Sequence, residues 1–204
     1  MGGESTREQL LDTLRRHVRD ERVLEAIAAV PRDRFVAPGR EAEAWSNEAL
    51  PIAHGQTISQ PLVVAHMCAL LDVHPGHRVL DVGTGSGYHA AVLATLGARV
   101  WSVERDPLLS ATASDNLRAA GIDGVTLLVG DGSRGYADGA PWDAINVAAA
   151  AQRDVPSALI EQLAAGGRLV LPLGDELVLV RRTAGGTIER HRAGAVRFVP
   201  LVEE

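Results

Sequence analysis

The chain has 204 residues, a length that suits one α/β domain with short additions rather than two independent domains. Hydrophobic residues make up 46% and aromatic residues only 3%, so Leu, Val, Ile and Ala must fill the core. The formal net charge is −6, all 20 basic residues are Arg, and no Arg-rich stripe alternates with aromatic side chains, so the sequence predicts no nucleic-acid binding.

Cys68 is the only cysteine, so no disulfide can form within the chain and we expect a reducing compartment. It lies in an apolar helical pattern, which favours a buried small side chain over a reactive thiol. The first five residues lack the basic flank and apolar run of a signal peptide. No stretch approaches the ~20 consecutive apolar residues of a membrane span. The sequence therefore predicts a cytoplasmic protein without membrane contact and leaves its oligomeric state open.

The first third of the chain predicts helices and loops. Thr6 and Gln9 resemble a capping box, and leucines then repeat at helical spacing. A second helix is expected over residues 21–29 and is stopped by Pro31. Residues 31–61 show little regular pattern, and a segment of that length without regular structure indicates a functional loop.

After this loop the pattern alternates between strands and helices. Strands are expected over residues 78–82, 99–103, 125–129 and 144–147, and helices over 88–96, 107–120 and 156–165. Such alternation predicts a mainly parallel sheet with helices on both faces. The tail lacks helices and predicts an antiparallel edge. Its expected strands cover residues 168–172, 177–182, 187–191 and 196–201.

A glycine-rich turn directly follows the strand expected over residues 78–82 and opens the next helix. Glycines let a backbone approach a ligand closely, because no Cβ intervenes. The spacing Gly-x-Gly-x-Gly differs from the dinucleotide fingerprint Gly-x-Gly-x-x-Gly. The acidic Asp81 before the turn suits a ligand with an ammonium and a sulfonium and is unfavourable beside a pyrophosphate. We therefore predict S-adenosylmethionine as the cofactor, held by Asp81, Gly83, Thr84, Gly85, Ser86 and Gly87.

Two further strand ends carry acidic residues. Glu104 ends the second strand, where a carboxylate can accept hydrogen bonds from both ribose hydroxyls. Asp131 follows the third strand and is expected to accept from the adenine amino group, while Gly132 leaves room for the ring. The alternative is that each acid caps the helix that follows it. Three acids at three successive strand ends favour the cofactor and predict a Rossmann-like methyltransferase fold.

The expected organisation is a single domain in three parts. An N-terminal helical and loop extension covers residues 1–61, a cofactor-binding α/β core covers 62–166, and antiparallel strands cover 167–204.

Six segments of the chain carry recognisable motifs: residues 30–36 (VPRDRFV), 50–52 (LPI), 55–61 (GQTISQP), 81–88 (DVGTGSGY), 130–132 (GDG) and 197–201 (RFVPL). Together they resemble the protein-L-isoaspartate O-methyltransferase family. The run GQTISQP is highly specific, whereas the glycine turn is shared by methyltransferases in general.

The resemblance implies methylation of the free carboxylate of L-isoaspartyl residues in damaged peptides and proteins, with S-adenosylhomocysteine as the product. The ester then closes to a succinimide, whose hydrolysis returns some normal aspartate. It also implies catalytic roles for Thr57 and Ser59, whose hydroxyls orient the carboxylate. The substrate-binding residues that it implies are Ile58, Gln60, Arg197, Phe198 and Val199.

This chemistry agrees with what the sequence lacks. A carboxylate is already ionised at neutral pH, so no general base is needed to create the nucleophile, and no Ser/His/Asp or metal-ligand pattern is found. Catalysis then depends on alignment and on removing water from the attacking oxygen. The alternative for Thr57 and Ser59 is that they cap the helix beginning near Pro61. His54, beside them, is interpreted as a solvated loop histidine rather than a substrate contact.

Some positions depart from the family pattern. Ala53 stands where glycine is common, Asn146 is polar within an apolar strand, and Ala148 replaces a usual threonine. Residues 149–153 form a segment one residue longer than is typical. We expect these changes to lie near the acceptor site and to leave cofactor binding unaffected.

Three other functions stay open at this point: a relative that methylates aspartate in one dedicated peptide, a small-molecule methyltransferase, and a catalytically silent binding module. Relatives of the first kind tend to carry an extra C-terminal region, so general repair is favoured for a sequence ending at Glu204. The specific loop argues against the second, and the intact acids and glycines argue against the third.

Overall fold

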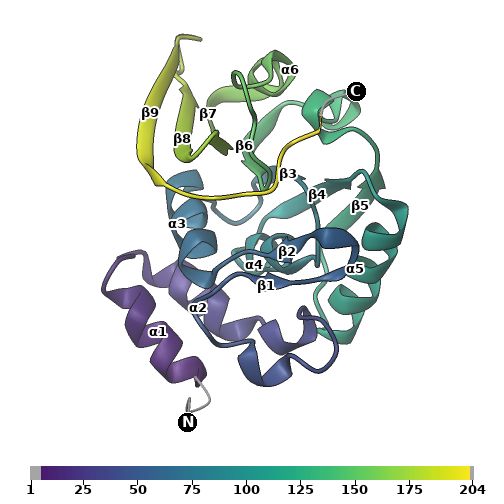
Figure 1. Ribbon diagram of the computed structural model, residues 1–204. Coiled ribbons are helices and arrows are strands. Elements are labelled where there is room, and N and C mark those ends of the chain that lie inside the picture. The colour runs from purple at the N-terminus through teal and green to yellow at the C-terminus, as the bar shows by residue number, and fades with distance from the viewer. Residues whose placement is uncertain (1–5, 203–204) are drawn as a thin grey trace.

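The fold is built around one mixed β-sheet. In the computed structural model, which describes residues 6–202, seven strands are ordered β5-β4-β3-β6-β7-β8-β9 (Figure 1). Strands β3 to β7 pair in parallel, and β8 and β9 continue the sheet as an antiparallel edge. This confirms the sheet that the sequence predicts. The strands are β3 Arg78–Val82, β4 Arg99–Glu104, β5 Val125–Val129, β6 Trp142–Val147, β7 Leu163–Leu173, β8 Glu176–Arg182 and β9 Ile188–Ala195.

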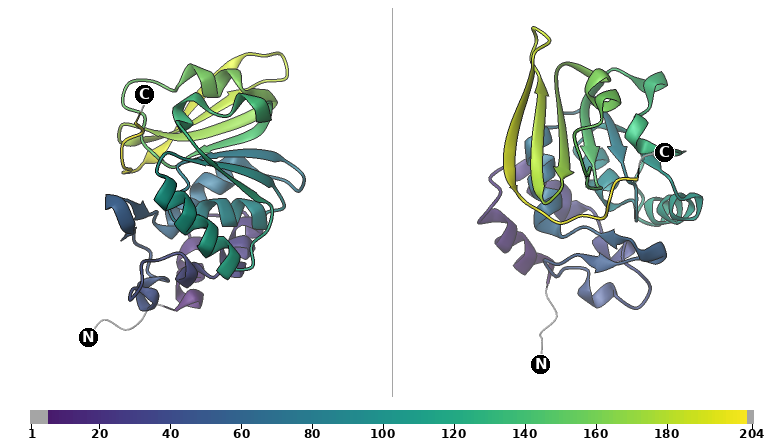
Figure 2. Two further views of the ribbon diagram at one scale, coloured as in Figure 1. Left: turned by 90° about the vertical axis from the view of Figure 1, so that its right-hand side faces the viewer. Right: turned by 45° about the horizontal axis from the view of Figure 1, so that its top comes forward.

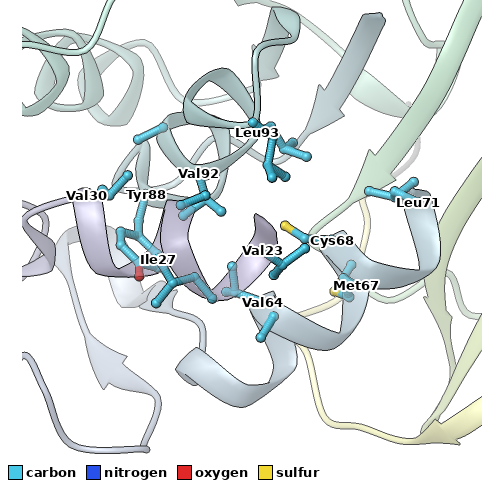
Figure 3. Close-up of a cluster of buried hydrophobic side chains, with 14 of the residues drawn as sticks. Val23, Ile27, Val30, Val64, Met67, Cys68, Leu71, Tyr88, Val92 and Leu93 are labelled. Carbon is cyan, nitrogen blue, oxygen red and sulfur yellow. The ribbon is translucent and has the colours of Figure 1, made fainter. Parts of the chain in front are cut away.

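Helices cover both faces of the sheet, as predicted. Side chains alternate along each strand, so Val79 and Ala144 pack with α2, α3 and α4 in one apolar cluster. Leu80 and Ile145 point to the other face and pack with Leu159 of α6. Figure 3 shows how α2, α3 and α4 interdigitate in the first cluster. The helices are α1 Arg7–Arg15, α2 Glu21–Ala29, α3 Pro61–Leu71, α4 Tyr88–Thr95, α5 Pro107–Ala119 and α6 Ser157–Glu161.

Residues 6–61 of the N-terminal extension lie below the sheet in both views of Figure 2. The capping box is confirmed, because Thr6 Oγ1 accepts from Gln9 N–H and Gln9 Oε1 accepts from Thr6 N–H. The loop-rich segment contains short 3₁₀ helices and a small antiparallel hairpin, whose Leu50 and Ile58 are buried. These elements are η1 Arg32–Arg34, η2 Glu41–Glu43, η3 Ala53–Gly55, β1 Leu50–Pro51 and β2 Thr57–Ile58.

Two expected elements in the C-terminal half are wrong. The helix predicted over 156–165 ends at Glu161, because β7 begins at Leu163 and pairs there with Trp142. The strand predicted over 196–201 does not form. Instead, residues 196–202 leave the edge of the sheet and run across the carboxyl ends of the parallel strands, where Pro200 makes a single bridge to Ala150 (Figures 1 and 2). We call residues 196–202 the C-terminal strap.

The start of α3 shows that the helix-capping interpretation of Thr57 and Ser59 is wrong. The N-cap residue is Gln60, and its side chain does not cap the helix but donates to the carbonyl of Asn47 at 2.8 Å. The cap comes from the preceding loop, because Asn47 Oδ1 accepts from Leu62 N–H at 3.0 Å.

Within residues 6–202, no helix combines the length and the apolar character that a membrane span requires. The first five residues, on which the signal-peptide expectation depends, lie outside the described part of the chain.

We predict that Asn47→Ala lowers the free energy of unfolding by about 1 kcal/mol, because Leu62 N–H loses its acceptor at the start of α3. Ser59→Ala should change it by less than about 0.5 kcal/mol, since its side chain caps nothing. Urea unfolding followed by circular dichroism measures both. Equal losses in the two variants would contradict this assignment of the cap.

Candidate active site

A cavity of about 540 Å³ lies at the carboxyl ends of the parallel strands, where sheets of this type bind their ligands. The glycine turn, the end of β4, the β1–β2 hairpin and the C-terminal strap form its walls. Ten of the predicted site residues line it: Thr57, Ile58, Ser59, Gly83, Thr84, Gly85, Ser86, Glu104, Gly132 and Val199.

Four other predicted residues lie outside the cavity lining. Gln60 is bonded to the preceding loop, and Gly87 is the N-cap of α4 in the left-handed conformation, with φ of 90°. Arg197 is exposed on the strap, and Phe198 is partly buried against the core. The structure places these four next to the cavity-lining segments without bringing them to the cavity itself.

Asp81 is buried one layer below the wall, in a polar row across three strands. Ser102 and Asn146 stand directly opposite it on β4 and β6. Ser102 Oγ donates to Asp81 Oδ2 at 2.6 Å, and Asn146 Nδ2 donates to Asp81 Oδ1 at 2.7 Å. Ser102 Oγ also lies 2.6 Å from Thr84 Oγ1. Asp81 therefore reaches the glycine turn through Ser102 and Thr84.

Asn146 has a second partner in this row, His89 of α4. Because the amide nitrogen must face the Asp81 carboxylate, His89 Nδ1, at 3.2 Å from it, acts as an acceptor. The proton of the neutral ring is then on Nε2, which points to Cys68 Sγ at 3.4 Å. Asn146 thus lies below the glycine turn rather than at the acceptor loop. Ser102 and His89 also belong to this polar row, and the sequence analysis did not identify either of them. The signal was available in part, since Ser102 and Asn146 are polar residues within apolar strands.

Burial shifts the pKa values of this cluster. It raises the pKa of Asp81 to about 6, even though hydrogen bonds from Ser102 and Asn146 act in the opposite direction. It lowers the pKa of His89 to about 3 and raises the pKa of Tyr88 to about 12. Neither His89 nor Tyr88, which both line the cavity, is therefore ready to remove a proton at neutral pH.

Glu104 joins two loops at the wall of the cavity. Its Oε2 accepts from Gly85 N–H at 2.9 Å, and its Oε1 accepts from Asp106 N–H at 3.1 Å. A carboxylate oxygen can accept more than one hydrogen bond, so ribose hydroxyls remain suitable partners.

The alternative that each strand-end acid caps the following helix holds for Asp131 but not for Glu104. It does not apply to Glu104, because Asp106 caps α5 by accepting from Leu108 N–H. It does apply to Asp131, which caps the 3₁₀ helix η4 (Gly132–Arg134) through Ser133 N–H at 2.9 Å and does not line the cavity. Gly132 is required sterically, since a Cβ there would lie 2.5 Å from Val82 Cγ1.

The β1–β2 hairpin closes the other side of the cavity. His54, at its tip, adopts φ of 58°, and its Nδ1 lies 2.5 Å from Asp106 Oδ2. His54 is exposed and lies outside the cavity lining, as expected of a solvated loop histidine, but it also pairs with Asp106. Loss of hydration by itself would raise the pKa of the Asp106 carboxyl. Hydrogen bonds from Leu108 N–H and His54 outweigh this effect and hold the pKa of Asp106 below its usual range. The pair fastens the hairpin to the start of α5, beside Glu104.

These features test the fit of the predicted cofactor. Gly83 and Gly85 have φ of 89° and 54°, so the turn presents backbone to the cavity without side chains. Glu104 and Gly132 also line the cavity, so a carboxylate stands where the sequence predicts the ribose and no side chain fills the place predicted for adenine. Sheet order, the glycine turn and the strand-end carboxylate of Glu104 together define a Rossmann-like, S-adenosylmethionine-dependent methyltransferase. Within residues 6–202, no group of three His, Cys, Asp or Glu side chains is placed to hold a metal ion.

Comparisons with known proteins agree with this class. The family model for protein-L-isoaspartate(D-aspartate) O-methyltransferase matches residues 5–204, and the chain belongs to that family. It is 49% identical to the protein-L-isoaspartate O-methyltransferase of Methanopyrus kandleri, over 97% of this chain and 92% of that relative. It is 48% identical to the Chromobacterium violaceum protein of the same name, over 99% and 92%.

Solved structures show the same likeness. A protein-L-isoaspartate O-methyltransferase aligns with a TM-score of 0.87 and 25% identity, over 97% of this chain and 66% of that chain. A Plasmodium falciparum structure of that name, in complex with S-adenosyl-L-homocysteine, aligns with a TM-score of 0.84 and 26% identity, over 98% and 100%.

We predict that Asp81 makes the protein less stable as the pH rises. Its pKa is about 6 when folded, against an ordinary 3.8, so the folded state binds the proton more tightly. The resulting stabilisation is fully present below the ordinary pKa and is lost as pH rises through the folded one. From about pH 4.5 to about pH 7.5, wild type should lose about 2 kcal/mol of unfolding free energy relative to Asp81→Asn. Urea titrations at both pH values measure this difference, and a constant difference would show that Asp81 is ionised throughout.

Proposed function

We propose that this protein transfers the methyl group of S-adenosylmethionine to the free carboxylate of L-isoaspartyl residues in damaged peptides and proteins. The observation that carries the proposal is that the hydroxyl-bearing residues Thr57 and Ser59 line the same cavity as the glycine turn. Family membership and the names of the relatives support the same reaction.

The reaction needs orientation more than proton transfer. When bound, S-adenosylmethionine supplies an electrophilic methyl group on a sulfonium. A carboxylate oxygen of the substrate forms a bond to that carbon while the carbon–sulfur bond breaks, which yields a methyl ester and S-adenosylhomocysteine. The hydroxyls of Thr57 and Ser59 donate hydrogen bonds that orient the carboxylate without neutralising it. The low pKa of His89 and the high pKa of Tyr88 agree with an acceptor that is already ionised.

The C-terminal strap forms the proposed wall for the peptide. Its position is set by Ala150, whose N–H donates to the Val199 carbonyl and whose carbonyl accepts from Leu201 N–H, each at 2.8 Å. Val199 lines the cavity and Arg197 is exposed beside it. We propose that Arg197, Phe198 and Val199 contact residues flanking the isoaspartyl group, together with Ile58 and Gln60 of the acceptor loop.

We also propose that the protein acts in the cytoplasm. Cys68 is free and buried, and burial raises the pKa of its thiol, so it is an apolar core residue that a reducing compartment suits.

Matched isoaspartyl and aspartyl versions of one peptide test the proposed function. Mass spectrometry should find a base-labile methyl ester on the isoaspartyl peptide, with one S-adenosylhomocysteine formed per ester. Preference for the aspartyl peptide would favour the dedicated-peptide alternative. A stable methyl amine or ether, or cofactor binding without turnover, would overturn the proposal.

We predict that Ser59→Ala lowers kcat by about one to two orders of magnitude, because one orienting hydrogen bond is lost in the transition state. Affinity for S-adenosylhomocysteine, measured by calorimetry, should stay near the wild-type value. Asn47→Ala is the matched control, since it weakens the cap of the adjacent helix and leaves the hydroxyl in place. Normal turnover in Ser59→Ala would remove this residue from catalysis.

A further inference from the structure

Arg32 is a fully buried cation next to the acceptor loop, and the proposed reaction does not yet use it. It lies in the 30–36 segment and has no exposed surface. Its Nε donates to the Ala44 carbonyl at 2.9 Å, and its Nη2 donates to the Ser59 carbonyl at 2.8 Å. A longer contact of 3.5 Å joins Nη2 to the Glu48 carbonyl. The guanidinium therefore fixes the main chain of Ser59, whose hydroxyl is proposed to orient the substrate.

The same guanidinium also touches the cofactor half of the site. Its Cζ lies 4.6 Å from the centre of the Tyr88 ring, close enough for a cation–π interaction. Tyr88 is the first residue of α4, directly after the glycine turn, and it lines the cavity. Its ring is held from another side by Phe35, at 5.6 Å between centroids, and Figure 3 shows it beside Ile27 and Val30. Arg32 is thus a bridge between the acceptor loop and the end of the cofactor loop.

The charge of Arg32 is not neutralised by a neighbour. Among residues 6–202, no carboxylate forms an ion pair with it, and its side-chain partner is the uncharged Tyr88. Burial lowers its pKa, yet an arginine remains protonated at any physiological pH. Burying a cation without an opposite charge lowers the free energy of unfolding, so a charge at this position needs a functional reason. In a low-dielectric interior, its positive potential reaches the adjacent cavity wall with little screening.

We propose that Arg32 is a positioning residue that holds the Ser59 main chain against Tyr88 and gives the acceptor wall a positive potential that selects a carboxylate. This inference rests on the proposed function, in which the acceptor is an anion. The hydrogen bonds set where the Ser59 hydroxyl points, and the charge favours entry of the substrate carboxylate. Because the guanidinium lies behind the wall, it does not neutralise the attacking oxygen.

Two variants separate position from charge. Arg32→Lys keeps the charge but loses the planar fork that joins Ala44 and Ser59, so kcat should fall about tenfold while KM for an isoaspartyl peptide stays within about threefold. Arg32→Gln loses the charge as well, so KM should also rise about tenfold. In both, hydrogen exchange of residues 57–60 should accelerate, and affinity for S-adenosylhomocysteine should stay within about twofold.

Arg78→Gln is the matched control. The Arg78 Cζ atom also lies over aromatic rings, 5.0 Å from the centre of the Trp101 ring and 5.6 Å from that of Trp142. Its guanidinium donates to the carbonyl of Gly139. Arg78 begins β3, at the end of the sheet opposite the cavity. This variant should lose stability and keep wild-type kcat and KM.

The outcomes are distinct. Wild type that fails to methylate the isoaspartyl peptide overturns the proposed function and this inference with it. Active wild type, with Arg32 variants that only lose stability as Arg78→Gln does, overturns the inference alone. A fall in S-adenosylhomocysteine affinity as large as the rise in KM would also overturn it, because Arg32 would then belong to the cofactor site. Should Arg32→Gln not fold, kcat and hydrogen exchange of Arg32→Lys decide the positioning role.

Discussion

The buried carboxylate of Asp81 is the constraint on which the geometry of the site depends. A charge inside a sheet is tolerated only when hydrogen bonds replace the water that it lost. Ser102 and Asn146 supply those bonds because strand pairing places them directly opposite Asp81. Ser102 then reaches Thr84, so the register of three strands sets the position of the glycine turn. A slip of one residue in any of these strands would turn its polar side chain to the opposite face and break the row.

The two halves of the cavity have different origins. Strand ends and the glycine turn make the cofactor half, and their positions follow from sheet pairing. The N-terminal extension makes the proposed acceptor half. It shares the main apolar core with α3 and α4, and two polar contacts join it to the cavity wall. His54 with Asp106 joins the hairpin to α5, and Arg32 joins the Ser59 main chain to Tyr88. The relative position of the two halves therefore depends on contacts between segments far apart in sequence.

Asn146 shows how one polar residue within an apolar strand shapes the interior rather than the acceptor wall. It bonds to Asp81 and selects the His89 tautomer, which in turn faces Cys68. The sequence marked Asn146 as unusual but located its effect near the acceptor. The reason is that strand periodicity gives the face of the sheet, whereas the partner on that face depends on which helices pack there.

The sequence by itself determined the parallel sheet with its antiparallel edge, the glycine turn, and the family to which the acceptor loop points. These follow from local periodicity and from motifs that act within a few residues. Only the tertiary structure decided that Asp81 lies below the cavity wall, that Asn47 caps α3, and that the C-terminal strap is not a strand. It also decided that Arg32 meets Ser59, 27 residues further along the chain. Each depends on which distant segments share the limited space around a buried polar group, and local pattern does not encode that choice.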